Sequence, residues 1–191
     1  GAQGIGEGAS EVFCQAGAKV VIWDVLDGKP TAARINEQGG EIFFQKVDIT
    51  QRGQVETAVA EIMTRYGRID ILINNAGIWR SSSFSSVNKE AWLESFTTNA
   101  IAPYEIAQAF LQNILDGSLK KVVSITSKMG SIEDNTSGGS YIYRSSKSAL
   151  NMVMRSLQHD LQSQGIATLT LHPGWVQTDM GGMNALINVD Q

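Results

Sequence analysis

The sequence predicts an α/β fold of the doubly wound class, in which helices cover both faces of a parallel sheet. Two observations lead to this prediction. Short runs rich in β-branched and aromatic residues alternate along the chain with longer segments whose apolar residues recur at helical spacing. Between these segments, no stretch has the composition of a domain linker, so we expect residues 1–191 to form one domain.

Five strands are expected. Each is a short run rich in Val, Ile, Phe or Thr, and polar residues or glycine lie between the runs. The runs are "KVVIWD" (19–24), "EIFFQKVD" (41–48), "IDILINN" (69–75), "KKVVSIT" (120–126) and "ATLTLHP" (167–173). Strands that alternate with helices in this way pair in parallel, with a helix in each connection.

Five helices are expected in the same alternation. The first follows Gly6, and the second begins after Asp27, where Pro30 suits a first helical turn. A long fourth helix covers about 88–115. The third and fifth have apolar residues on one face, the third at Val55, Val59, Ile62 and Tyr66 and the fifth at Leu150, Met154, Leu157 and Leu161.

Composition excludes several classes of function. The net charge of −4 and the isoelectric point near 5.2 argue against a general binder of nucleic acid or anionic membranes. The sequence has no run of 18 apolar residues and no secretory signal, so we expect a cytoplasmic protein. Cys14 is the only cysteine, which excludes an internal disulfide, and one cysteine with two histidines argues against a metal site.

The segment "GAQGIGEGA" (1–9) places glycines directly before a predicted helix. Glycines let backbone N–H groups approach a pyrophosphate, and a helix N-terminus favours the negative charge. A glycine cluster can equally be a tight turn. Asp24 ends the next strand, 18 residues after Gly6, close to the spacing expected of a carboxylate that binds the adenosine ribose. A carboxylate there can also cap a turn; the two features together favour a dinucleotide site.

The segment "YRSSK" (143–147) places Tyr143 and Lys147 on neighbouring turns of a helix. A nearby cation stabilises phenolate, so we expect Lys147 to lower the pKa of Tyr143 and fit it for proton exchange with an alcohol or carbonyl oxygen. Ser127 ends a strand at the sheet edge where ligands bind in open α/β folds. A surface Tyr–Lys pair and a loop-capping serine are the alternatives.

These motifs resemble those of the short-chain dehydrogenase/reductases. "GAQGIG" supplies the last six positions of that family's T-G-x-x-x-G-x-G loop, and Asp24 matches its cofactor-selecting acid. "VDIT" (47–50) matches the segment beside the adenine, and "NNAG" (74–77) matches the segment that lines the cofactor. Asn99, Ser127 and the Tyr-x-x-x-Lys pair match the catalytic positions, and "PGWVQT" (173–178) matches the segment that holds the nicotinamide carboxamide.

The resemblance implies a Rossmann-type fold and a Ser-Tyr-Lys-Asn mechanism. Tyr143 would exchange the proton, Lys147 would also bind the nicotinamide ribose, Ser127 would polarise the substrate oxygen, and Asn99 would hold a water. The expected cofactor contacts are Gln3, Gly4, Ile5, Gly6, Asp24, Asp48, Ile49, Asn75, Ala76, Gly77, Tyr143, Lys147, Pro173, Gly174, Val176 and Thr178. Because Asp24 would repel a 2′-phosphate and Gln3 is not basic, we expect NAD(H) rather than NADP(H).

The expected function is therefore hydride transfer between a nicotinamide cofactor and a secondary alcohol or ketone. The alternative is a non-catalytic dinucleotide-binding protein with a signalling role, because residues 120–185 look most like the C-factor-like branch. Many members of this family form dimers or tetramers, so the resemblance implies a homodimer or homotetramer. We expect no nucleic-acid or membrane partner. The resemblance also places a first strand before Gly1 and further elements after residue 191, so we expect a fragment of a longer protein that neither folds nor binds cofactor alone.

Overall fold

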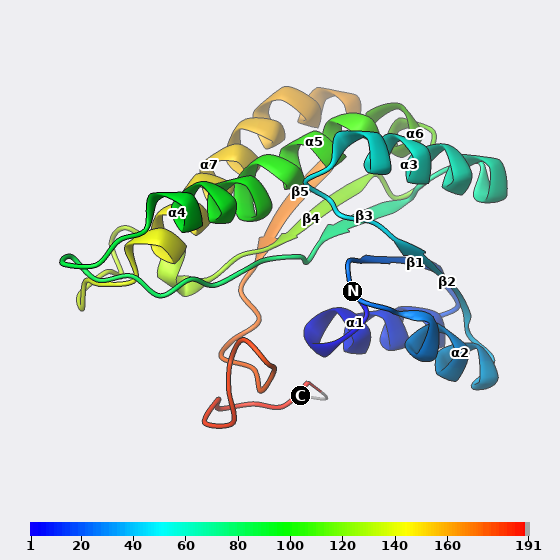
Figure 1. Cartoon of the computed structure of the whole chain (residues 1–191). Helices are drawn as coiled ribbons and strands as arrows, with labels where there is room; N and C mark the ends of the chain where they lie inside the picture. Colours follow the sequence, from blue (N-terminus) through cyan, green and yellow to red (C-terminus); the bar gives the residue numbers. More distant parts are fainter. Residues whose placement is uncertain (190–191) are drawn as a thin grey trace. The chain divides into compact units, whose positions relative to one another are not determined.

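The computed structural model describes residues 1–189, in which parallel strands alternate with helices (Figure 1). The chain divides into two compact units, which we call the first unit (residues 1–62 with 175–189) and the second unit (63–174). Each unit contains one parallel sheet, a two-stranded sheet in the first and a three-stranded sheet in the second. The predicted α/β class with parallel strands is confirmed.

In the first unit, an apolar core lies between one face of the sheet and two helices. The strands β1 (Lys19–Asp24) and β2 (Glu41–Lys46) pair in parallel, and α1 (Gly4–Gln15) and α2 (Lys29–Glu37) pack on them. The side chains of this core are Cys14, Val20, Ile22, Ala32, Ile35, Ile42 and Phe44. The strand residues of this core are Val20 and Ile22 on β1 and Ile42 and Phe44 on β2. They occupy alternate positions of each strand, so their side chains point to the same face of the sheet.

The opposite face of this sheet contacts α3 (Arg52–Tyr66) through a chain of polar side chains. Trp23 Nε1 donates a hydrogen bond to Gln45 Oε1 (2.7 Å), and Gln45 Nε2 donates one to Glu61 Oε2 (2.8 Å). Val55, Ala58 and Ile62 of α3 are buried. Helices therefore contact both faces of the β1–β2 sheet, which is the doubly wound arrangement.

In the second unit, three parallel strands are arranged in the order β3 (Ile71–Asn74), β4 (Lys121–Ile125) and β5 (Ala167–Leu171). Figure 1 shows α4 (Lys89–Phe96), α5 (Ala102–Ala109) and α7 (Tyr141–Leu161) together on one side of this sheet. The remaining elements are α6 (Leu111–Leu115), the π-helix η1 (Thr97–Ile101) and the 3₁₀ turns η2 (Lys128–Gly130) and η3 (Gln162–Gln164). Of the helices in residues 1–189, none has the length and apolarity to cross a membrane.

The predicted long helix over 88–115 is wrong as one element, since α4, η1, α5 and α6 divide it. In η1 the N–H of Ala102 bonds the carbonyl of Thr97, five residues back. Pro103 has no N–H, so it cannot provide the α-helical bond to the carbonyl of Asn99. The strand predicted at 19–24 is confirmed as β1, whereas the other four strands end earlier than predicted. β2 stops at Lys46, where the side chain of Asp48 accepts the N–H of Thr50 (2.9 Å) and turns the chain toward α3.

Candidate active site

The second unit contains all four predicted catalytic residues. Asn99 belongs to η1, Ser127 directly precedes η2, and Tyr143 and Lys147 lie one turn apart on α7. Lys147 Nζ lies 5.9 Å from the centre of the Tyr143 ring. The helical spacing predicted from the sequence therefore does bring the phenol and the amine together.

Lys147 is almost completely buried, with 4% of its surface exposed. Its Nζ donates a hydrogen bond to the carbonyl of Ile125 at 2.9 Å. Burial disfavours the charged form and lowers the pKa of Lys147 to about 8. The amine can therefore lose its proton close to neutral pH.

The pKa of Tyr143 moves in the opposite direction to the one predicted. Burial raises it, and a hydrogen bond with the Ser127 side chain offsets this only in part. The prediction that Lys147 lowers the pKa of Tyr143 is wrong for this structure, because the lysine amine faces the Ile125 carbonyl and is itself desolvated. At neutral pH the phenol keeps its proton.

The Ser127 hydroxyl is fixed in place by a backbone hydrogen bond that leaves its own hydrogen available. Its Oγ accepts the backbone N–H of Met129 at 3.2 Å, a bond that caps η2. A hydroxyl that accepts from the backbone still has its own hydrogen to donate. The Ser127 hydroxyl can therefore donate to an oxygen beside Tyr143, whose raised pKa the serine partly offsets.

Asn99 is fully buried, and its side chain forms three hydrogen bonds with neighbouring residues. Its Nδ2 donates to the carbonyl of Ile78 and to Ser146 Oγ, both at 2.9 Å, and its Oδ1 accepts the N–H of Ile78 at 2.8 Å. A Cβ on Gly77 would stand 3.4 Å from both Asn99 Oδ1 and Lys147 Nζ. Asn99 therefore anchors the chain at Ile78, directly after the segment Asn75–Gly77 that follows β3. Sequence patterns gave no signal for Ser146.

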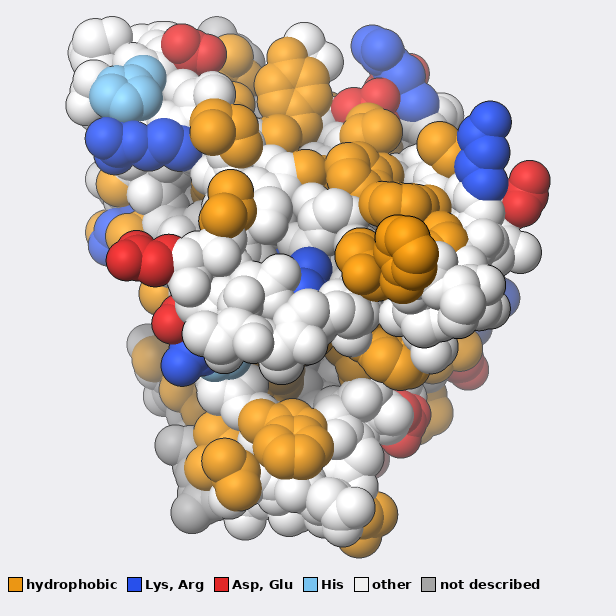
Figure 2. Space-filling view, turned by 90° about the vertical axis from the view of Figure 1, so that its left-hand side faces the viewer, with side chains coloured by type: hydrophobic (Ala, Val, Ile, Leu, Met, Phe, Trp, Pro, Cys, Tyr) orange, Lys and Arg blue, Asp and Glu red, His pale blue; other side chains and the backbone are white. Residues whose placement is uncertain are grey.

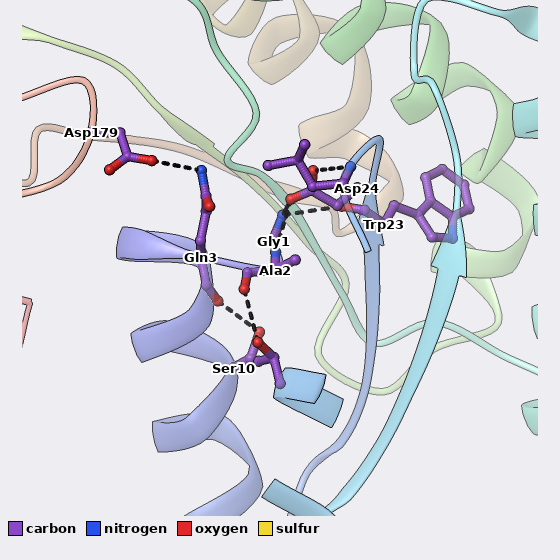
Figure 3. Close-up of polar contacts among 10 residues, drawn as sticks. Gly1, Ala2, Gln3, Ser10, Trp23, Asp24 and Asp179 are labelled. Carbon is purple, nitrogen blue, oxygen red and sulfur yellow. Dashed lines mark hydrogen bonds and ion pairs between the residues drawn. The ribbon is translucent and has the colours of Figure 1, made fainter. Parts of the chain in front are cut away.

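In the first unit, the glycine loop lies against the segment that follows residue 174. A Cβ on Gly4, whose φ is +58°, would stand 3.1 Å from Cγ2 of Thr178. Gln3 Nε2 donates to Asp179 Oδ2 at 3.2 Å (Figure 3). The first turn of α1, which begins at Gly4 and includes Ile5 and Gly6, presents N–H groups that suit a phosphate.

Asp24 ends β1 and accepts three hydrogen bonds (Figure 3). Its Oδ2 accepts from the amino group of Gly1 (2.7 Å) and the N–H of Ala2 (2.8 Å), and its Oδ1 accepts the N–H of Leu26 (3.0 Å). Burial acts to raise the pKa of Asp24, but these bonds outweigh it and lower the pKa below its ordinary value. Asp24 therefore caps the loop as a carboxylate, and its oxygens can accept further bonds.

The other predicted cofactor residues belong to loops at the ends of strands. Asp48 and Ile49 follow β2, and Val176 is buried in the first unit, where it pairs with Ile187. In the second unit, Ala76 follows β3, and the chain leaves β5 through Pro173 and Gly174. In residues 1–189, no three His, Cys, Asp or Glu side chains form a group that could hold a metal ion.

Known proteins are similar to this chain in sequence. The sequence profile of the short chain dehydrogenases matches residues 1–185. The C-signal protein of Myxococcus xanthus is 46% identical over 124 residues, which cover 63% of this chain and 74% of that protein. The 3-oxoacyl-acyl-carrier-protein reductase FabG of Chlamydia pneumoniae is 30% identical over 185 residues, covering 94% of this chain and 72% of the reductase.

A solved structure has the same fold. The NADPH-bound carbonyl reductase from chicken fatty liver superposes with a TM-score of 0.89 at 28% identity, covering 99% of this chain and 83% of the reductase. The likeness to the C-factor-like branch predicted from the sequence is confirmed by the identity with the C-signal protein.

Proposed function

Because the chain belongs to the short-chain dehydrogenase family, we propose that it transfers a hydride between a nicotinamide cofactor and a secondary alcohol or ketone. One observation supports this proposal most directly: Ser127, Tyr143 and Lys147 form a connected group in the second unit. The bound nicotinamide would supply or accept the hydride, and the chain's own residues would hold the substrate and move the proton.

Tyr143 suits carbonyl reduction because its phenol holds a proton at neutral pH that it can donate to the substrate oxygen, although burial raises its pKa and so makes it a weaker acid. The Ser127 hydroxyl would donate a second hydrogen bond to the same oxygen as negative charge develops on it. Lys147 has three donors when protonated, and one bonds Ile125, so the others are available for the nicotinamide ribose. Asn99 keeps Gly77 close to this amine.

The proposed cofactor is NAD(H). Gly4 begins α1, and the N–H groups of the first turn of this helix suit a phosphate of a dinucleotide. Asp24 supports NAD(H) over NADP(H), because its lowered pKa keeps it negative and the charge would repel a 2′-phosphate. The structurally similar carbonyl reductase has NADPH bound, so the preference of this chain must be measured directly.

A second candidate function is dinucleotide binding without turnover, in a signalling role. The identity of 46% with the C-signal protein favours it. The two are distinguished by mixing the full-length protein with NADH and a panel of ketones and following the absorbance at the nicotinamide band. Consumption of NADH that is lost in Tyr143→Phe supports the enzyme, whereas NADH binding without consumption for any ketone supports the signalling role.

We also propose a cytoplasmic homodimer or homotetramer, to be tested by cell fractionation and light scattering at micromolar concentration. The apolar face of α7 at Leu150, Met154 and Leu157 is buried within the chain, so it offers no surface to a second copy. Hydrophobic side chains are nevertheless visible among polar ones on the face shown in Figure 2. A protein that is monomeric under these conditions would contradict the proposed assembly.

A further inference from the structure

Three consecutive residues at the end of β4 each lie against one residue of a single stripe on α7. Ile125 bonds Lys147 and Thr126 bonds Asn151, while Ser127 lies beside Tyr143 and offsets part of the rise in its pKa. The three helix positions are four residues apart, so they lie on one side of α7. Thr126 Oγ1 donates to Asn151 Oδ1 at 2.6 Å. Asn151 thus extends the group of catalytic residues by one turn.

Asn151 also holds the far side of the turn that contains Ser127. Its Nδ2 donates to the carbonyl of Gly130 at 3.4 Å, and Ser148 Oγ donates to the same carbonyl at 2.8 Å. Gly130 packs so closely on α7 that a Cβ there would stand 2.9 Å from the carbonyl carbon of Lys147. The segment 126–130 is therefore fixed to the helix at both ends, and Ser127 lies between the two fixed points.

We propose that Asn151 is a positioning residue, which acts through Thr126 and Gly130 to hold the Ser127 hydroxyl against Tyr143. The inference rests on the proposed function, because Ser127 and Tyr143 act together only in that reaction. A displacement of about 1 Å in a reacting group can cost ~100-fold in rate. Loss of the Asn151 bonds should therefore lower kcat on the order of 10–100-fold and leave cofactor affinity unchanged.

The test uses substitutions that keep side-chain volume. Thr126→Val removes the hydroxyl, Asn151→Leu removes the amide, and Thr126→Ser restores the hydroxyl. The matched control is Thr168→Val on β5, because Thr168 Oγ1 also donates to α7, at the Met154 carbonyl (3.2 Å) and at Gln158 Oε1 (2.9 Å). Each variant is made in the full-length protein and assayed for kcat with NADH and a ketone, for NADH affinity by fluorescence, and for stability by denaturation.

We expect kcat to fall only in the variants that break the Thr126–Asn151 bond. Thr126→Val and Asn151→Leu lower kcat, the double variant is no slower than the slower single variant, and Thr126→Ser keeps the wild-type rate. Thr168→Val loses stability without losing kcat. An equal loss of kcat in Thr168→Val, or losses that multiply in the double variant, would overturn the inference.

A second measurement separates this inference from the proposed function. Hydrogen exchange of the peptide 127–131 reports whether the turn is held, since the N–H of Met129 bonds Ser127 Oγ. Exchange should rise in Asn151→Leu and stay unchanged in Thr168→Val. If it does not rise in Asn151→Leu, the positioning role is refuted whatever the activity. A wild-type protein that turns over no ketone would refute the proposed function while the exchange result still decides the positioning role.

Discussion

The hydroxyl of Ser82 caps helix α7 by accepting the backbone N–H of Ile142 at 3.1 Å, across 60 residues of sequence. The residue directly before the helix, Ser140, is in the left-handed region at φ 47° and gives no side-chain cap. Ser82 also accepts the N–H of Ser140 through its own carbonyl, at 3.2 Å. The helix that contains Tyr143 therefore begins at a position fixed by the loop after β3.

Ser82→Ala should lower the free energy of unfolding by about 1 kcal/mol, which is the usual cost of losing a helix cap. Chemical denaturation measures this loss. Ser85→Ala is the matched control, since Ser85 belongs to the same serine-rich loop and is exposed. Equal stability of the two variants would show that the Ser82 hydroxyl does not cap α7.

Tyr143→Phe should abolish ketone reduction while NADH binding remains. The substitution removes only the hydroxyl, and loss of general acid–base catalysis is worth ~10²–10⁴ in rate. Stopped assays with NADH and a ketone measure the rate, and fluorescence measures the affinity. Substantial turnover by this variant would assign the proton transfer to another group.

The buried amine of Lys147 should make stability depend on pH. Its ordinary pKa of 10.5 falls to about 8 on folding, so the unfolded chain binds this proton more tightly than the folded chain. The free energy of unfolding should therefore rise as pH increases from about 8 to 10, by at most about 3 kcal/mol from this group. Above pH 10 the raised pKa of Tyr143 acts in the opposite direction.

Lys147→Met provides the comparison for this pH dependence. Denaturation of both proteins at several pH values between 8 and 10 should give a slope for the wild type that the variant lacks. Parallel curves would mean that the lysine keeps an ordinary pKa in the folded protein.

Cofactor preference should respond to charge at the glycine loop. Asp24→Ala combined with Gln3→Arg removes a negative charge and adds a positive one, so kcat/KM should shift from NADH toward NADPH. Because Gln3 already bonds Asp179, the new arginine can pair with that carboxylate, and adding Asp179→Asn should enlarge the shift. The proposed NAD(H) preference fails if the wild type uses NADPH as well as or better than NADH.

Stability of the Asp24 variants needs its own control. The carboxylate caps the N–H groups of Ala2 and Leu26, so Asp24→Ala should lower the melting temperature. Asp24→Asn keeps an acceptor without the charge. A shift in preference that occurs in both variants can be assigned to charge and not to loss of structure.

The sequence was sufficient to predict the features of the fold that follow a periodic pattern and the features of the site that match a motif. The five strands and the helical spacing of Tyr143 and Lys147 follow from local periodicity, which survives in a single sequence. The contacts made by Ser82, Ser146 and Asn151 were not predicted. Each of them joins segments that are far apart in sequence, and a lone polar side chain leaves no periodic signal.

The predicted direction of the Tyr143 pKa shift was also wrong. The expected effect of Lys147 on Tyr143 assumed that proximity of two groups decides their pKa values. Burial of both groups instead sets the direction of each shift, and burial depends on packing that the spacing of two residues does not report.

The π-helix at Thr97–Ile101 affects how sequences of this region should be aligned. A π turn contains one residue more than the α turn it replaces. A homologue whose helix is regular here would align with this chain only through a one-residue gap inside a helix, where alignment procedures penalise gaps most. If that gap is suppressed, Asn99 is paired with a neighbour of its true counterpart, and the asparagine predicted to be catalytic is counted as absent.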